Sequence, residues 1–252
     1  MKEALFYLVV LLANVIQGIT GFAGTILAMP FSVRLVGMDT AVPVLNVLGL
    51  LSGIYVFAGS RKSVDTGEIK KVLTVTVPAV IAGLFIRRWL SGRPAVLYLI
   101  LGVIVTATAV LGLWKMFLRK KDASGQTSDA EGPEKSAALS ALILAASGLV
   151  HGMFVCGGPL LISYLASRIK DKTAFRATIS TVWIFLNGII LVSQIISGAW
   201  NMGLLKAQLL TVPFLLAGML LGSVLYKRMS QRVFMAVTYV LLLTAGISLF
   251  FK

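Results

Sequence analysis

The sequence is poor in the residues on which soluble enzymes and secreted domains depend. Its 252 residues include one cysteine and one histidine, and 13% are charged against 58% hydrophobic. A single cysteine, Cys156, excludes an intramolecular disulfide, and no Cys/His cluster has metal-ligand spacing. Soluble domains carry about 25% charged residues. The composition is therefore that of a membrane protein, and we expect no metal and no other cofactor.

Acidic residues are scarce as well. Nine Asp and Glu stand against 23 Lys and Arg, a formal net charge of +14. The basic residues cluster between hydrophobic runs, for example at 61–62, 119–121 and 227–228. This pattern is typical of cytoplasmic loops that face anionic lipid headgroups. We therefore expect a multi-pass protein of the cell membrane that binds no nucleic acid.

Uncharged runs of about 20 residues, the length of a transmembrane helix, recur along the chain. They cover 40–60, 72–90, 95–115, 177–199, 207–226 and 232–251. Two longer apolar stretches, 4–36 and 137–167, each contain a glycine cluster. The sequence predicts an all-α polytopic membrane protein.

An internal repeat divides the chain into two halves. VPAVIAGLFI at 77–86 matches VPFLLAGMLL at 212–221, an offset of 135 residues. Nearly the same offset aligns the two glycine clusters, with Gln17 facing His151. We predict a first repeat at 1–118 and a second at 137–252, each a glycine-broken segment followed by three transmembrane helices. Residues 119–136 are a polar linker with too little apolar surface to fold.

The glycine-broken segments are too long for one span. At about 1.5 Å per residue, residues 4–36 would form a helix of roughly 50 Å. Breaks at membrane depth are tolerated where backbone lines a cavity, and the N-terminus of a half-helix suits an anion. If each segment returns as a re-entrant hairpin, most basic residues lie on one face and the halves are inverted. A single broken span, or glycines that only permit close helix crossing, are the alternatives.

Such a repeat is the usual build of secondary transporters, with the substrate between the halves. His151 titrates near neutral pH and could couple transport to protons; a neutral core histidine is the alternative. Asn187 is a lone amide in an apolar helix, which is costly without a partner. The candidate substrate-binding residues are Gln17, Gly18, Thr20, Gly21, Gly24, Asn46, His151, Gly152, Gly157, Gly158, Ser180 and Asn187.

Other polar and aromatic residues have simpler interpretations. We expect the arginines near the breaks, Arg34, Arg168 and Arg176, to extend toward the membrane surface. The alternative is that they bind an oxyanion, since the planar guanidinium donates two parallel hydrogen bonds. The tryptophans lie mostly near predicted span ends, where they would form an interfacial belt: Trp89, Trp114, Trp183 and Trp200. We expect Cys156 to be a small packed residue.

Three stretches together resemble the TauE/SafE family of sulfite exporters: GITGFAGTILAMP at 18–30, GLVHGMFVCGGPLL at 148–161, and VP...AG in the third span of each half. The family's GxGGGxxxxP pattern is degraded. The first copy keeps only Gly21, Gly24 and Pro30, and the second has Tyr164 where proline would fall. The resemblance implies export of sulfite, sulfoacetate or related organosulfur anions.

We therefore expect a secondary transporter that moves small anions by alternating access, and no enzyme. A homo-oligomer is compatible with the sequence. Two alternatives stay open: an intramembrane thiol or sulfur relay built on Cys156 and His151, and a membrane scaffold subunit that transports nothing.

Overall fold

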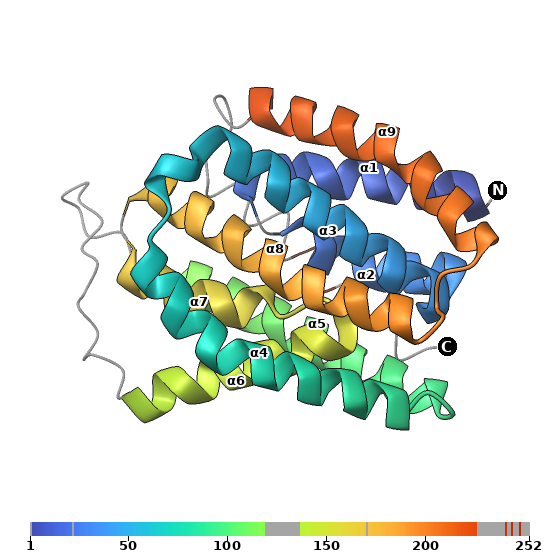
Figure 1. Cartoon of the computed structure of the whole chain (residues 1–252), viewed down its shortest axis with the longest axis horizontal. Coiled ribbons are helices and arrows are strands. Elements are labelled where there is room, and N and C mark those ends of the chain that lie inside the picture. Colours follow the sequence, from blue (N-terminus) through green and yellow to red (C-terminus); the bar gives the residue numbers. More distant parts are fainter. Residues whose placement is uncertain are drawn as a thin grey trace.

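The computed structural model describes residues 2–21, 23–118, 137–169 and 171–225, and the single positions 240, 243 and 247. These residues form helices, with no strand among them (Figure 1). The helices are α1 (Lys2–Thr20), α2 (Gly24–Val36), α3 (Met38–Ser60), the short 3-10 helix η1 (Arg61–Ser63), α4 (Thr66–Trp89), α5 (Pro94–Leu118), α6 (Ala137–Phe154), α7 (Gly158–Arg168), α8 (Lys172–Ile196) and α9 (Met202–Leu225).

Seven of these helices are long and apolar enough to cross a membrane, namely α1, α3 to α6, α8 and α9. The prediction of an all-α polytopic membrane protein is therefore confirmed. The short helices α2 and α7 have 13 and 11 residues, about half the length that a span requires. The predicted linker at 119–136 lies outside the described residues, as does most of the span predicted at 232–251.

Both glycine-broken stretches fold as helical hairpins. After α1 the chain doubles back, so that a side chain at Gly24 would collide with the carbonyl oxygen of Ala13. After α6 it doubles back in the same way, and the Ser147 hydroxyl donates a hydrogen bond of 2.8 Å to the carbonyl oxygen of Gly157. The structure therefore favours the hairpin over a single broken span at both places.

The two hairpin turns share one backbone geometry. Gly21 and Val155 each follow the long helix and have positive φ values, 83° and 57°. The Gly21 N–H donates to the Gln17 carbonyl oxygen over 2.7 Å, and the Val155 N–H donates to the His151 carbonyl oxygen over the same distance. These positions are related by the offset that aligns the two glycine clusters in the sequence.

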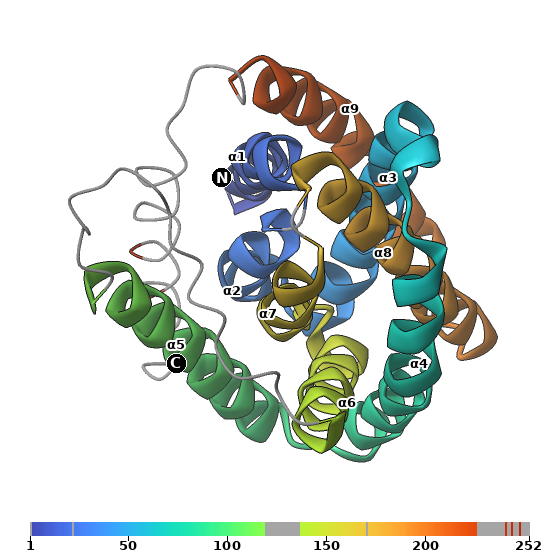
Figure 2. The ribbon, with the colours of Figure 1, turned by 90° about the vertical axis from the view of Figure 1, so that its left-hand side faces the viewer.

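Each hairpin packs on the other half of the chain. α1 lies along α9 and α6 lies along α4 (Figure 2), in both cases through glycines that leave no room for a side chain. Between them α3 and α8 cross in opposite directions. The Asn46 side-chain N–H donates to the Asn187 carbonyl oxygen over 3.0 Å, while Gly53 packs against the backbone of Ser180.

The helix ends define two faces of the bundle. η1 and the turn between α7 and α8 lie at the left of Figure 1, and we call this side the η1 face. The N-terminus and the turns joining α4 to α5 and α8 to α9 lie at the right, and we call that side the α8–α9 face. From their turns, α2 runs toward the α8–α9 face and α7 toward the η1 face, so the two hairpin turns meet between the faces.

Candidate functional site

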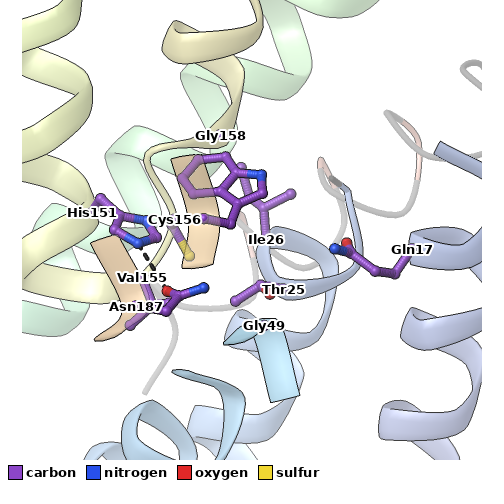
Figure 3. A pocket seen from close by; sticks show the side chains of 10 residues that line it. Gln17, Thr25, Ile26, Gly49, His151, Val155, Cys156, Gly158 and Asn187 are labelled. Carbon is purple, nitrogen blue, oxygen red and sulfur yellow. Dashed lines mark hydrogen bonds between the residues drawn. The ribbon is translucent and has the colours of Figure 1, made fainter. Parts of the chain in front are cut away.

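A small cavity lies where the two hairpin turns meet the middle of α3 and α8. Its volume is about 20 Å³, which is room for a water molecule. Figure 3 shows residues of both hairpins around it, with Gln17 on one side and His151 on the other. The lining residues are Gln17, Thr25, Ile26, Gly49, His151, Val155, Cys156, Gly158, Trp183 and Asn187.

Two helix N-termini open onto this cavity. Thr25 and Ile26 belong to the first turn of α2, and Gly158 is the first residue of α7. The first amides of a helix have no carbonyl partner within that helix, and the aligned peptide dipoles give this end a partial positive charge. Two such ends directed at one cavity favour a negatively charged ligand.

His151 and Asn187 form the polar centre of the second hairpin's side. Their side chains are both 2% exposed, and His151 Nε2 lies 3.0 Å from Asn187 Oδ1 (Figure 3). Because Asn187 presents its amide oxygen, Nε2 is the donor of this bond. In the neutral ring Nδ1 then carries a lone pair, and among the described residues Nδ1 has no hydrogen-bond partner.

Trp183 lies against the same histidine, with the ring centroids 4.8 Å apart. Its side chain is 5% exposed, and its Nε1–H likewise has no partner in the part of the chain that the structure describes. A buried donor without a partner costs about 1–3 kcal/mol, so native structures rarely keep one without a reason. The cavity wall thus holds a donor that a bound ligand could satisfy.

Gln17 occupies the equivalent position in the first hairpin but is fully bonded. Its Oε1 accepts from the Gly24 N–H over 2.8 Å. Its Nε2 donates to the Gly21 carbonyl oxygen over 3.3 Å and to the Ser52 hydroxyl over 3.2 Å. Gln17 therefore holds the turn closed and ties it to α3.

The electrostatic surroundings of the cavity are positive. No lining residue is an Asp, Glu, Lys or Arg. Arg176 on α8 reaches the first hairpin, where its Nη2 donates to the Gly18 carbonyl oxygen over 3.0 Å and its aliphatic stem packs against Gly21. A fixed cation at the hairpin and two helix N-termini attract an anion, and no lining carboxylate repels it.

The structure brings some predicted site residues together and places others elsewhere. Gln17, His151, Gly158 and Asn187 line the cavity, and Gly21, Gly24 and Gly157 form the turns beside it. Asn46 and Ser180 are buried on α3 and α8.

Gly18 and Gly152 do not line the cavity. A side chain at Gly18 would collide with the carbonyl oxygen of Met219 on α9, and one at Gly152 with that of Val80 on α4. Close helix packing accounts for both glycines, which was the alternative interpretation of these clusters. The side chain of Thr20, also predicted to bind substrate, lies outside the described part of the chain.

The interfacial position predicted for Trp183 is wrong, because the indole is buried beside His151. The prediction took the span to begin at 177, whereas α8 begins at Lys172, which places Trp183 three turns deep. Arg176 also turns inward instead of extending to the surface. The spacing of four residues between Trp183 and Asn187, which puts both on one helix face, was the signal available in the sequence.

Thr25, Gly49 and Cys156 line the cavity as well, and none was among the candidate binding residues. Gly49 makes room for its neighbour, because a Cβ there would lie 2.9 Å from Asn187 Nδ2. Cys156 is 2% exposed. Among the described residues Nε2 of His151 bonds to Asn187 and Nδ1 bonds to nothing, so the thiol and the imidazole form no hydrogen bond.

A family described as "Sulfite exporter TauE/SafE" matches residues 6–249. No curated protein matches the chain. No solved structure matches it either.

Proposed function

The chain belongs to the TauE/SafE sulfite exporter family, and from this premise we propose that it is a secondary transporter of a small oxyanion that binds in the central cavity. Sulfite, sulfoacetate or a related organosulfur anion is the substrate class that the family name supports. The observation that carries the proposal is a buried cavity on which two helix N-termini converge. Within the described part of the chain, the Trp183 N–H in its wall has no partner and no lining residue is acidic.

The chemistry of the lining suits an oxyanion. Oxygen atoms of sulfite or a sulfonate accept hydrogen bonds only. The cavity offers donors from Trp183 and from the backbone of Thr25, Ile26 and Gly158, which line it in the first turns of α2 and α7. The cavity of about 20 Å³ admits a water molecule but is too small for an ion with four heavy atoms. The structure therefore corresponds to a closed state, and binding requires the hairpins to separate from α3 and α8.

A thermal-unfolding assay in lipid nanodiscs tests the proposal. We expect sulfite or sulfoacetate to raise the unfolding temperature, with a stabilisation that grows as RT ln(1 + [L]/Kd), about 2.7 kcal/mol at a hundredfold excess over Kd. Acetate and chloride at matched ionic strength serve as controls. If all anions act alike, the assigned substrate class fails.

The variant Trp183→Phe locates the site. Phenylalanine keeps an aromatic ring beside His151 but removes the unpartnered donor, so we expect unchanged or higher stability and a roughly tenfold weaker affinity for the anion, about 1.4 kcal/mol. The matched control is Trp89→Phe on α4, because Trp89 is 79% exposed. Equal affinities in the two variants would place the anion elsewhere.

A further inference from the structure

A second, larger cavity lies between α3, α8 and α9 at the α8–α9 face. Its volume is about 480 Å³, and Val47, Leu191, Trp200, Leu205 and Gln208 contribute to its walls. The α8–α9 turn borders this cavity, and Ile195 and Met202 at its edge are 60% and 68% exposed. The cavity therefore opens where the helices end and not at the middle of the bundle.

Buried amides without partners accompany this cavity. Gln208 is 5% exposed, and its Oε1 has no partner among the described residues. Gln194 is 6% exposed, and over the same residues neither Nε2 nor Oε1 has one. Lipid offers such groups nothing, whereas water and an oxyanion both form hydrogen bonds with them. Three buried amide atoms without partners need an explanation.

The second cavity follows the central one along α8. Asn187 lines the central cavity and Leu191, four residues later on the same helix face, lines the second. Gln194 follows three residues later, next to Ile195 at the cavity edge. On α3, Gly49 lines the central cavity and Val47 the second, and a spacing of two residues places them on different sides of this helix. The two cavities are therefore neighbours along α8, between the centre and the α8–α9 face.

On the opposite side, protein contacts occupy the corresponding place. The Tyr164 hydroxyl on α7 donates to Glu68 Oε2 on α4 over 3.1 Å, and Lys71 Nζ lies 2.7 Å from Glu68 Oε1. Glu68 is 8% exposed and lies in the first turn of α4, next to η1. Lys71 balances its charge, so the contact between α7 and α4, and not charge repulsion, closes this side.

We propose that the cavity between α3, α8 and α9 is the vestibule through which the anion passes between the central cavity and the α8–α9 face, with the amide of Gln208 in its wall and that of Gln194 next to its outer edge. The proposal rests on the proposed transport function. It adds the route, the side of the bundle on which it opens and two residues that contact the anion in passage.

Cysteine labelling in lipid nanodiscs tests the vestibule without requiring transport. The reagent is methanethiosulfonate ethylsulfonate, which is anionic, does not cross lipid and carries a sulfonate group. We expect Gln208→Cys to react at least about tenfold faster than Leu216→Cys, its control two turns further along α9. Leu216 is 48% exposed on a membrane-spanning helix. The native Cys156 is 2% exposed and should react slowly in both.

Each outcome decides the proposal. Faster reaction of Gln208→Cys, slowed by added sulfoacetate, which does not react with the reagent, supports a vestibule that the substrate enters. Equal, slow reaction of both variants shows a cavity filled by lipid or closed to solution, and overturns the proposal. If the wild-type protein moves no sulfite in proteoliposomes, the proposed function fails, while the labelling result still decides whether an anion enters the cavity.

A second variant separates passage from folding. Gln194→Leu replaces a buried amide without partners by an apolar side chain of similar size, so a purely structural residue would leave flux unchanged. We expect unfolding at the same or a higher temperature together with at least about tenfold slower sulfite flux. Unchanged flux in this variant would remove Gln194 from the route.

Discussion

The two hairpins have the same backbone but use their polar residues in opposite ways. In the first, every polar atom of the Gln17 side chain bonds to the protein, and the turn residue Gly21 adopts positive φ without cost. In the second, His151 leaves Nδ1 without a partner among the described residues. Its turn residue is Val155 at φ 57°, a region that β-branched residues rarely occupy.

This difference indicates that the two hairpins have different roles in ligand binding. The first hairpin, whose turn Gln17 ties to α3, serves as one wall of the cavity. Strained backbone and unpartnered polar groups concentrate at functional sites. The positive φ of Val155 and the His151 Nδ1 atom, which lacks a partner among the described residues, both belong to the second hairpin. We infer that α6–α7 carries the element that responds to the ligand, while α1–α2 provides the frame against which it moves.

The largest expected effects test what the hairpins share, which is glycine packing. In Gly152→Ala the new methyl would overlap the Val80 carbonyl oxygen, and we expect a loss of about 3 kcal/mol in unfolding free energy. Gly18→Ala should cost about 1 kcal/mol, because its Cβ would lie 2.9 Å from the Met219 carbonyl oxygen. Gly188 faces open space, so Gly188→Ala is the control and should lose nothing.

Chemical or thermal unfolding in nanodiscs measures the unfolding free energies of the three glycine variants. A Gly188→Ala variant as unstable as Gly152→Ala would show that helix flexibility, and not close packing, is what the glycines provide.

A smaller effect should separate the two hairpins. Gln17→Leu leaves the Gly24 N–H and the Gly21 carbonyl oxygen without their side-chain partner, and we expect a loss of about 2 kcal/mol in unfolding free energy. The control is His151→Gln, which can still donate to Asn187 Oδ1 and should cost well under 1 kcal/mol. Equal losses of unfolding free energy in the two variants would mean that both hairpins are rigid frames, and the proposed difference between them would be wrong.

When flux is measured instead of stability, the order of the two variants should reverse, and His151→Gln should lose more than Gln17→Leu. Glutamine keeps a donor to Asn187 but removes the imidazole ring, so flux should fall about tenfold. The assay uses sulfoacetate in proteoliposomes. A variant with the flux of the wild type would show that His151 takes no part in transport.

The sequence supports the class of the fold more securely than the site. Hydrophobic runs and glycine clusters predict membrane helices and two breaks because lipid forbids unpaired backbone. Gln17, His151 and Asn187 stand out as lone polar residues in apolar helices. The contact between His151 and Asn187 spans 36 positions, and α3 brings Gly49 beside these two residues. Both features depend on tertiary packing, which no local sequence pattern indicates.

The sequence-based predictions that were wrong, for Trp183 and for the two glycines, have local causes. Asp171 caps α8 by accepting the Ala174 N–H over 2.7 Å, so the helix starts before the uncharged run does, and Trp183 lies deep instead of at the membrane surface. Gly18 and Gly152 are part of the breaks in the sequence, but they face α9 and α4. The face that a glycine presents is set by the neighbouring helix, which is distant in the chain.

The smallest expected effect concerns the contact that closes the η1 face, which joins α7 of the second hairpin to α4. Tyr164→Phe removes the hydroxyl that donates to Glu68 over 3.1 Å, while Lys71 still neutralises the carboxylate. We expect a loss of about 1 kcal/mol in unfolding free energy. If α6–α7 is the moving hairpin, flux should rise about twofold, because this contact must break whenever the η1 face opens.

Tyr98→Phe is the control, since its 3.5 Å bond to the Val33 carbonyl oxygen joins α5 to the first hairpin. A flux gain in Tyr98→Phe and none in Tyr164→Phe would assign the motion to α1–α2 and exchange the roles of frame and responding element.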